Sequence, residues 1–121
     1  MTGRVLVALT AATLGVLAVP ARAESPPEAR VTIRLFQYRP EALVVAPGTR
    51  VVWRNDDDIE HTATSGTPEG ADGGFDLRLA GAGASGAVEF SRPGLHPYFC
   101  ARHPSMRGQV RVTDTRERSD P

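Results

Sequence analysis

The sequence has no lysine, a single cysteine and no net charge, and these shortages exclude several classes of protein. The lone Cys100 cannot form an internal disulfide, and it cannot supply a zinc site with paired cysteines, an iron–sulfur cluster or a Cys-x-x-Cys redox pair. Because 14 basic residues balance 14 acidic ones, the composition gives no reason to expect a nucleic-acid or anionic membrane partner, which would need surplus positive charge. At 121 residues the chain is expected to fold as one domain.

The N-terminal segment is typical of a cleavable secretory signal. Arg4 precedes an apolar stretch at residues 5–19, and Ala21-Arg22-Ala23 is a cleavage site of the small-x-small type. The alternative is a membrane anchor, but a spanning helix needs about 20 apolar residues, and Pro20 and Arg22 end this stretch early. We therefore expect residues 1–23 to be a signal peptide, removed on export to the periplasm or an equivalent compartment, with no stable membrane insertion afterwards.

The remaining chain consists of short extended runs separated by turn residues. Residues 24–30 are polar and proline-rich and predict a flexible lead-in. Residues 65–74 predict a loop, and residues 114–121 a flexible tail. Strands are predicted near residues 31–36, 42–46, 51–53, 61–64, 88–90, 95–100 and 109–113, with turns such as Pro47-Gly48 between them. No helical periodicity occurs outside the signal, so residues 31–113 are predicted to form an all-β sandwich.

Three metal-binding side chains are concentrated near the C-terminus, at Cys100, His103 and Met106. Their spacing is Cys-x-x-His-x-x-Met, which places a thiolate, an imidazole and a thioether within seven residues. A mononuclear copper site of the electron-transfer kind uses one Cys, two His and a weak axial Met. One histidine is missing from this cluster and must come from elsewhere in the chain.

The second histidine is either His61 or His96. His96 lies four residues before Cys100 on one extended run, which puts the two residues roughly 13 Å apart, too far to share a metal ion. His61 follows a polar turn and opens a different strand, so it can project onto the loop at residues 100–106. We therefore predict His61 as the other imidazole ligand and His96 as a packing residue.

The order of motifs along the chain resembles the cupredoxins, in the plastocyanin and amicyanin branch. The similarity covers residues 31–113, and the short Cys-to-His and His-to-Met spacings resemble those of amicyanin. The residues that carry the resemblance are Phe36-x-Tyr38-x-Pro40, Leu43-x-Val45, Gly48-Thr49-x-Val51-x-Trp53-x-Asn55, His61-Thr62-x-Thr64, Gly94-x-x-x-Tyr98-x-Cys100 and Cys100-x-x-His103-x-x-Met106-x-Gly108.

The resemblance implies a Greek-key β-sandwich of about eight strands with one type 1, or blue, copper ion. It implies that His61, Cys100, His103 and Met106 are the ligands and that Asn55 ties the two ligand loops together. The chain departs from the family at Ala101, where a hydroxyl residue is common, and at Glu60, where proline is common. A carboxylate at Glu60 would lower the reduction potential if it pointed inward, but we expect it to face solvent.

Several other residues receive structural interpretations. Trp53 is expected to pack in the core with Val51 and Phe36. The run Asp56-Asp57-Asp58 is most simply a solvated turn, or else an acidic docking patch. Arg102 and Arg107 flank His103 and offer an alternative docking surface.

The predicted function is a monomeric periplasmic carrier that passes one electron between redox proteins, such as a dehydrogenase, a cytochrome or an oxidase. The edge of His103 is the candidate port for the electron. The alternative is a copper-binding carrier or homeostasis protein without an electron-transfer role. An enzyme is not expected, because the chain neighbours of Cys100 are Phe99 and Ala101 rather than the histidines that connect to a multicopper cluster.

Overall fold

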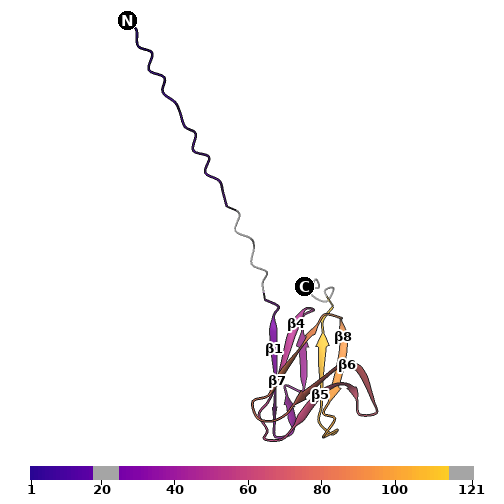
Figure 1. Cartoon of the computed structure of the whole chain (residues 1–121). Coiled ribbons are helices and arrows are strands. Elements are labelled where there is room, and N and C mark those ends of the chain that lie inside the picture. Colours follow the sequence, from indigo (N-terminus) through magenta and orange to yellow (C-terminus); the bar gives the residue numbers. More distant parts are fainter. Residues whose placement is uncertain (18–24, 115–121) are drawn as a thin grey trace.

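A computed structural model describes residues 1–17 and 25–114, and these contain nine strands and no helix (Figure 1). The strands are β1 (Glu28–Arg34), β2 (Gln37–Arg39), β3 (Ala42–Val45), β4 (Thr49–Asn55), β5 (His61–Thr67), β6 (Gly70–Leu79), β7 (Ser85–Phe90), β8 (Gly94–Phe99) and β9 (Arg107–Val112). The predicted all-β sandwich is confirmed, with nine strands rather than about eight.

The strands form two sheets that pack face to face (Figure 1). One sheet has the order β2-β1-β4-β7, and the other has the order β3-β9-β8-β5-β6. Two pairs are parallel, β1 with β4 and β3 with β9, whereas the other pairs are antiparallel. Parallel neighbours cannot be joined by a tight hairpin, so these two pairs require the chain to cross between the sheets.

Alternating side chains of the two sheets form the core. In β4 the burial alternates along the strand, and Val51 and Trp53 are fully buried while their neighbours are not. Trp53 packs edge-on against Tyr98 of the other sheet, with ring centroids 5.2 Å apart. In β4, alternate residues therefore face the core, as expected for a strand with one buried face.

The first strand begins earlier than predicted. Glu28 to Arg30 belong to β1, inside the stretch expected to be a flexible lead-in, because this part of β1 pairs in parallel with β4 from Arg50 to Val52. The predicted cleavage site lies within residues 18–24, and most of the predicted tail lies within residues 115–121, both outside the described residues.

The predicted loop at residues 65–74 is mostly strand. Ser65 to Thr67 end β5, and Gly70 begins β6, so the hairpin turn is only Pro68-Glu69. Gly66 has a φ of 106°, and a Cβ atom there would lie 2.5 Å from the Gly70 carbonyl oxygen. Glycine is rare in strands, so the composition predicted a loop, but here it permits the close approach of two backbones.

Residues 1–17 have no regular secondary structure and are exposed, so they contribute nothing to the core. Among the described residues, no helix is long and apolar enough to cross a membrane.

Candidate metal centre

The segment that carries Cys100, His103 and Met106 is a tight loop between β8 and β9. The Cys100 N–H donates to the Met106 carbonyl at 3.0 Å, and the Met106 N–H donates to the His103 carbonyl at 2.8 Å. Cys100 is fully buried and Met106 is 5% exposed. These backbone bonds close the loop on itself, so its side chains are held in place before any ligand is bound.

His61 reaches this loop from the neighbouring strand. It is the first residue of β5 and is fully buried. Because β5 pairs directly with β8, through Thr64 with Phe99 and Ser65 with Tyr98, the sheet itself fixes His61 relative to Cys100.

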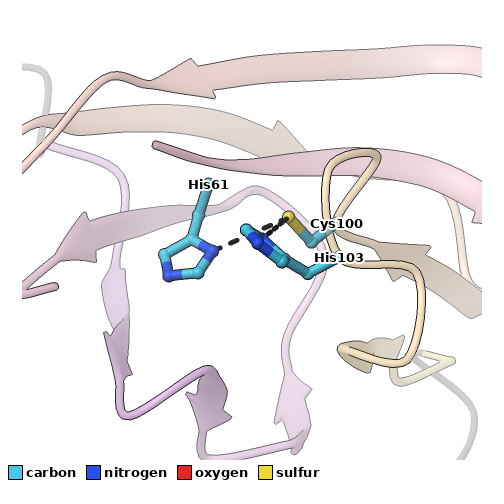
Figure 2. A group of neighbouring side chains, drawn as sticks. All are labelled: His61, Cys100 and His103. Carbon is cyan, nitrogen blue, oxygen red and sulfur yellow. Dashed lines mark hydrogen bonds between the residues drawn. The ribbon is translucent and has the colours of Figure 1, made fainter. Parts of the chain in front are cut away.

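Three predicted ligand side chains converge at one point (Figure 2). The Cys100 Sγ lies 3.7 Å from His61 Nδ1 and 3.9 Å from His103 Nδ1. One donor atom from each of the three residues lies within 4.8 Å of the others. Two ligands at trigonal angles around an ion with bonds of about 2.0–2.3 Å are roughly 3.5–4 Å apart, so the observed spacing fits a single metal ion.

The sulfur atom is also contacted by a backbone group of the neighbouring strand β5. The Thr62 N–H points at Cys100 Sγ at 3.4 Å, and the Thr62 hydroxyl accepts from the Ala101 N–H at 2.8 Å. Thr62 therefore joins the His61 strand to the Cys100 loop on both sides of the sulfur. A hydroxyl residue at position 101 is not needed for this link.

Asn55 does not have the role that the sequence predicted. Its amide donates to the carbonyls of Ile59 and Leu79, and its oxygen accepts from the Asp57 N–H. None of these partners lies in the loop at residues 100–106. Asn55 instead shapes the turn that precedes His61, and Thr62 connects the two ligand segments.

Asp57 contacts a predicted ligand, which the sequence interpretation missed. It lies in the turn expected to be solvated, yet its carboxylate Oδ2 is 2.8 Å from His61 Nε2 and its side chain is 12% exposed. Burial opposes ionisation, but hydrogen bonds from Phe36, His61 and Leu35 together hold the pKa of Asp57 below its usual value. The one available signal was its position four residues before His61.

Phe36 is not in the core with Trp53 and Val51, as expected, but at the metal-binding end. It is 49% exposed, and its ring packs edge-on against His103 at 5.0 Å and His61 at 5.2 Å between centroids. Phe36 lies in the β1–β2 turn, of which Leu35 and Phe36 are the two loop residues, so it is not part of a strand that faces the core.

Glu60 is paired with two arginines, and its side chain is 18% exposed. Its carboxylate lies 3.0 Å from Arg78 and 3.1 Å from Arg102. The hydrogen bond from Arg78, with the charge of Arg102, lowers the pKa of Glu60. Arg102 is therefore engaged in an ion pair rather than free beside His103.

His96 lies apart from the three converging side chains. Its Nε2 is 2.8 Å from the Arg92 carbonyl oxygen, and its ring packs against Phe90. It belongs to none of the metal-binding groups found among the described residues, which agrees with its predicted packing role.

The donor set has the chemistry of a copper site. A thiolate and a thioether suit Cu(I), and imidazole suits both oxidation states of copper. Asp57 holds the outer nitrogen of His61, so the inner nitrogen is the one that faces Cys100. The residues present therefore fit copper.

Comparisons with known proteins agree with this chemistry. The sequence matches the copper-binding proteins of the plastocyanin/azurin family over residues 28–113. No match was found among curated proteins.

Three solved structures illustrate the likeness. The purple cupredoxin from Nitrosopumilus maritimus is 28% identical, with a TM-score of 0.66, and the match covers 70% of this chain and 99% of that one. A reduced amicyanin variant is 28% identical, with a TM-score of 0.60 and coverage of 69% and 79%. A copper-containing nitrite reductase from Thermus scotoductus is 27% identical, with a TM-score of 0.64, covering 81% of this chain but only 25% of the enzyme. This chain belongs to the plastocyanin/azurin family of copper-binding proteins, the cupredoxins, and its cofactor is copper.

Proposed function

We propose that the protein is an exported one-electron carrier that binds one type 1 copper ion through His61, Cys100, His103 and Met106. The observation that carries this proposal is the convergence of two imidazoles and one thiol within 4.8 Å, on a loop that also holds a buried methionine. When bound, copper supplies a couple between Cu(I) and Cu(II), which is the only chemistry that the proposal requires.

The protein supports electron transfer by keeping its ligands still. His61 is fixed by β5 and by Asp57, while Cys100 is fixed by bonds to Met106 and Thr62. A site held between the geometries that Cu(I) and Cu(II) prefer changes little when an electron moves. The backbone bonds around the loop therefore favour rapid transfer.

The electron would enter and leave at His103. His61 is fully buried, whereas His103 is partly exposed and lies beside the half-exposed ring of Phe36. A redox partner such as a dehydrogenase, a cytochrome or an oxidase would dock over this edge. The apolar Phe36 ring next to it suits a contact that is brief and rapidly released.

The proposed location is the periplasm or another exported compartment, reached through the signal at residues 1–23. A free thiol in an oxidising compartment is at risk of oxidation. Cys100 is fully buried and would be a copper ligand, so both burial and metal binding would protect it.

The chain offers no support for an enzymatic role. The nitrite reductase shares only part of its length with this chain. The neighbours of Cys100 along the chain, Phe99 and Ala101, cannot bind a second copper ion that would act as a catalytic centre. We therefore propose electron transfer without catalysis.

Copper(II) added to the purified protein tests the proposal. We expect an intense visible charge-transfer band from the Cys100 thiolate and a reversible one-electron couple in voltammetry. A colourless protein that binds only Cu(I), and that releases it readily to a chelator, would instead indicate a copper carrier or homeostasis protein.

A further inference from the structure

Asp57 makes an arrangement of hydrogen bonds that the copper ligands alone do not explain. Its Oδ2 lies 2.8 Å from His61 Nε2 and 3.0 Å from the Phe36 N–H, and its Oδ1 accepts from the Leu35 N–H at 2.8 Å. Two of these partners are backbone N–H donors, and His61 Nε2 is a third donor when its ring carries the proton there. An ionised carboxylate can accept from all three.

His61 is the one side chain in the ion-pair set of the described residues that pairs with Asp57. Three arginines are paired with other carboxylates: Arg54 with Asp56, and Arg78 and Arg102 with Glu60. Among the ion pairs of the described residues, Asp57 takes part only in the one with His61. Its negative charge is thus not neutralised by a guanidinium, and a metal ion bound to His61 would experience it.

The turn that Asp57 holds is strained. Leu35 and Phe36 have φ angles of 51° and 58°, a region that bulky side chains rarely adopt and that costs of order 1 kcal/mol or more for each residue. Asp57 accepts from both of their N–H groups, and the Phe36 ring then lies against the rings of His61 and His103. One carboxylate therefore fixes both a ligand and the aromatic ring that covers it.

We propose that Asp57 is a positioning residue for the copper site, which orients His61 and lowers the reduction potential of the metal. By accepting the Nε2–H of His61, it leaves Nδ1 without a proton and aimed at Cys100, which is the form that binds a metal. This inference rests on the proposed function, because it concerns the preference of the same site for one oxidation state.

The direction of the effect follows from charge. With a thiolate and two neutral imidazoles, the site has no net charge around Cu(I) and one positive charge around Cu(II). A carboxylate held against His61 stabilises the positive state and raises the basicity of the imidazole. Both effects favour Cu(II) and therefore lower the potential.

Asp57→Asn tests this, with Asp56→Asn as the matched control. Both substitutions remove one negative charge from the same turn, but Asp56 is paired with Arg54 and its side chain is 39% exposed. We expect Asp57→Asn to lower the affinity for Cu(II) relative to that for Cu(I) by about tenfold, which raises the reduction potential by about 59 mV. Asp56→Asn should shift that ratio less than twofold. Equal shifts in the two variants would overturn the proposal.

A purely structural role would weaken both oxidation states together and leave the potential unchanged, and that result also overturns the proposal. Asp57→Glu keeps the charge and should return the potential most of the way to the wild-type value. If it behaves like Asp57→Asn, the charge is not the cause.

A second measurement uses the copper-free wild-type protein, so it does not depend on whether a substituted protein folds. Nitrogen NMR of the copper-free wild-type protein, at a pH above the ordinary pKa of imidazole, should show His61 with its proton on Nε2 and with slow exchange. A proton on Nδ1 would overturn the proposal. This result does not depend on copper, so it tests the role of Asp57 separately from the electron-carrier function. If the electron-carrier function is wrong, the wild type will show no reversible couple.

Discussion

At the scale of single residues, Cys100 is the group on which copper chemistry depends. It is fully buried, 3.7 Å from His61 and 3.9 Å from His103, so its sulfur is the atom that the two imidazoles share. Cys100→Ser replaces a soft thiolate with a hydroxyl that copper binds poorly. We expect this variant to lose the visible band completely in a copper titration followed by absorption spectroscopy.

His96→Phe is the control for that substitution. It removes a histidine that bonds the Arg92 carbonyl and packs on Phe90, away from Cys100. The band and the potential should therefore be retained. Loss of the band on replacing His96 would mean that the ligand assignment is wrong.

The sequence placed the ligand types well but not the residues that orient them. Cysteine, histidine and methionine at short spacing are a donor set typical of copper sites. Cys100, His103 and Met106 could therefore be proposed as ligands before the fold was known. Asp57 could not, because aspartate in a polar turn is common and its partners, Leu35 and Phe36, lie more than twenty positions away. The Asn55 prediction was wrong for a related reason, since a buried amide can bond to any nearby backbone group, and here those groups are Ile59 and Leu79.

At the scale of elements, the pairing of β8 with β9 and with β5 brings together the segments that carry the proposed ligands. Cys100 follows β8, Met106 precedes β9, and His61 opens β5. Short extended runs between turn residues predicted most of these strands. This pattern failed at β6, where Gly70, Gly73 and Gly74 provide no apolar side chains and pairing with β5 alone defines the strand.

Gly108 in β9 provides an element-scale prediction. A Cβ atom at this position would lie 2.4 Å from the ring of Tyr98, which is buried in the core on the neighbouring strand. Gly108→Ala should therefore force β8 and β9 apart and lower the free energy of unfolding by about 2 kcal/mol. Urea denaturation measures this change.

Gly70→Ala is the matched control. Gly70 is also in a strand, but nothing lies within 4 Å of the place that an alanine methyl group would take there. Its free energy of unfolding should stay within about 0.5 kcal/mol of the wild-type value. Similar losses in both variants would show that glycine itself, and not the contact with Tyr98, is the cause.

At the scale of the whole molecule, the fold separates a rigid sandwich from a metal-binding end. The core residues Trp53 and Tyr98 are fully buried between the sheets, and burial raises the pKa of Tyr98 to about 12, an effect that the nearby Trp53 partly offsets. The exposed Phe36 and the partly exposed His103 lie together at one end. Stability and electron exchange are thus assigned to different parts of one small domain.

Acid stability is the last prediction, and it follows from carboxylates on several elements. Hydrogen bonds from Ser65 and the Gly74 N–H lower the pKa of Asp72, and the ion pairs of Glu60 lower its pKa as well. A carboxyl whose pKa is lower when folded contributes stability above its unfolded pKa, and that stability is lost as the pH falls through the folded value. The free energy of unfolding of the copper-free protein should therefore fall as the pH drops below about 4.

Asp72→Asn isolates one of these groups. Asp72 Oδ1 accepts both of its hydrogen bonds, from the Ser65 hydroxyl and the Gly74 N–H. The amide oxygen of an asparagine can accept the same two bonds, but the amide does not gain a proton as the pH falls. At pH 7 this variant should be less stable than the wild type, because a neutral amide oxygen accepts these hydrogen bonds less strongly than a carboxylate does. Its loss of stability below pH about 4 should be shallower, because unfolding is no longer linked to the protonation of Asp72. Urea denaturation at a series of pH values measures both slopes. Parallel slopes would mean that Asp72 titrates alike in the folded and unfolded chains, and that its bonds to the β5–β6 hairpin do not contribute to acid stability.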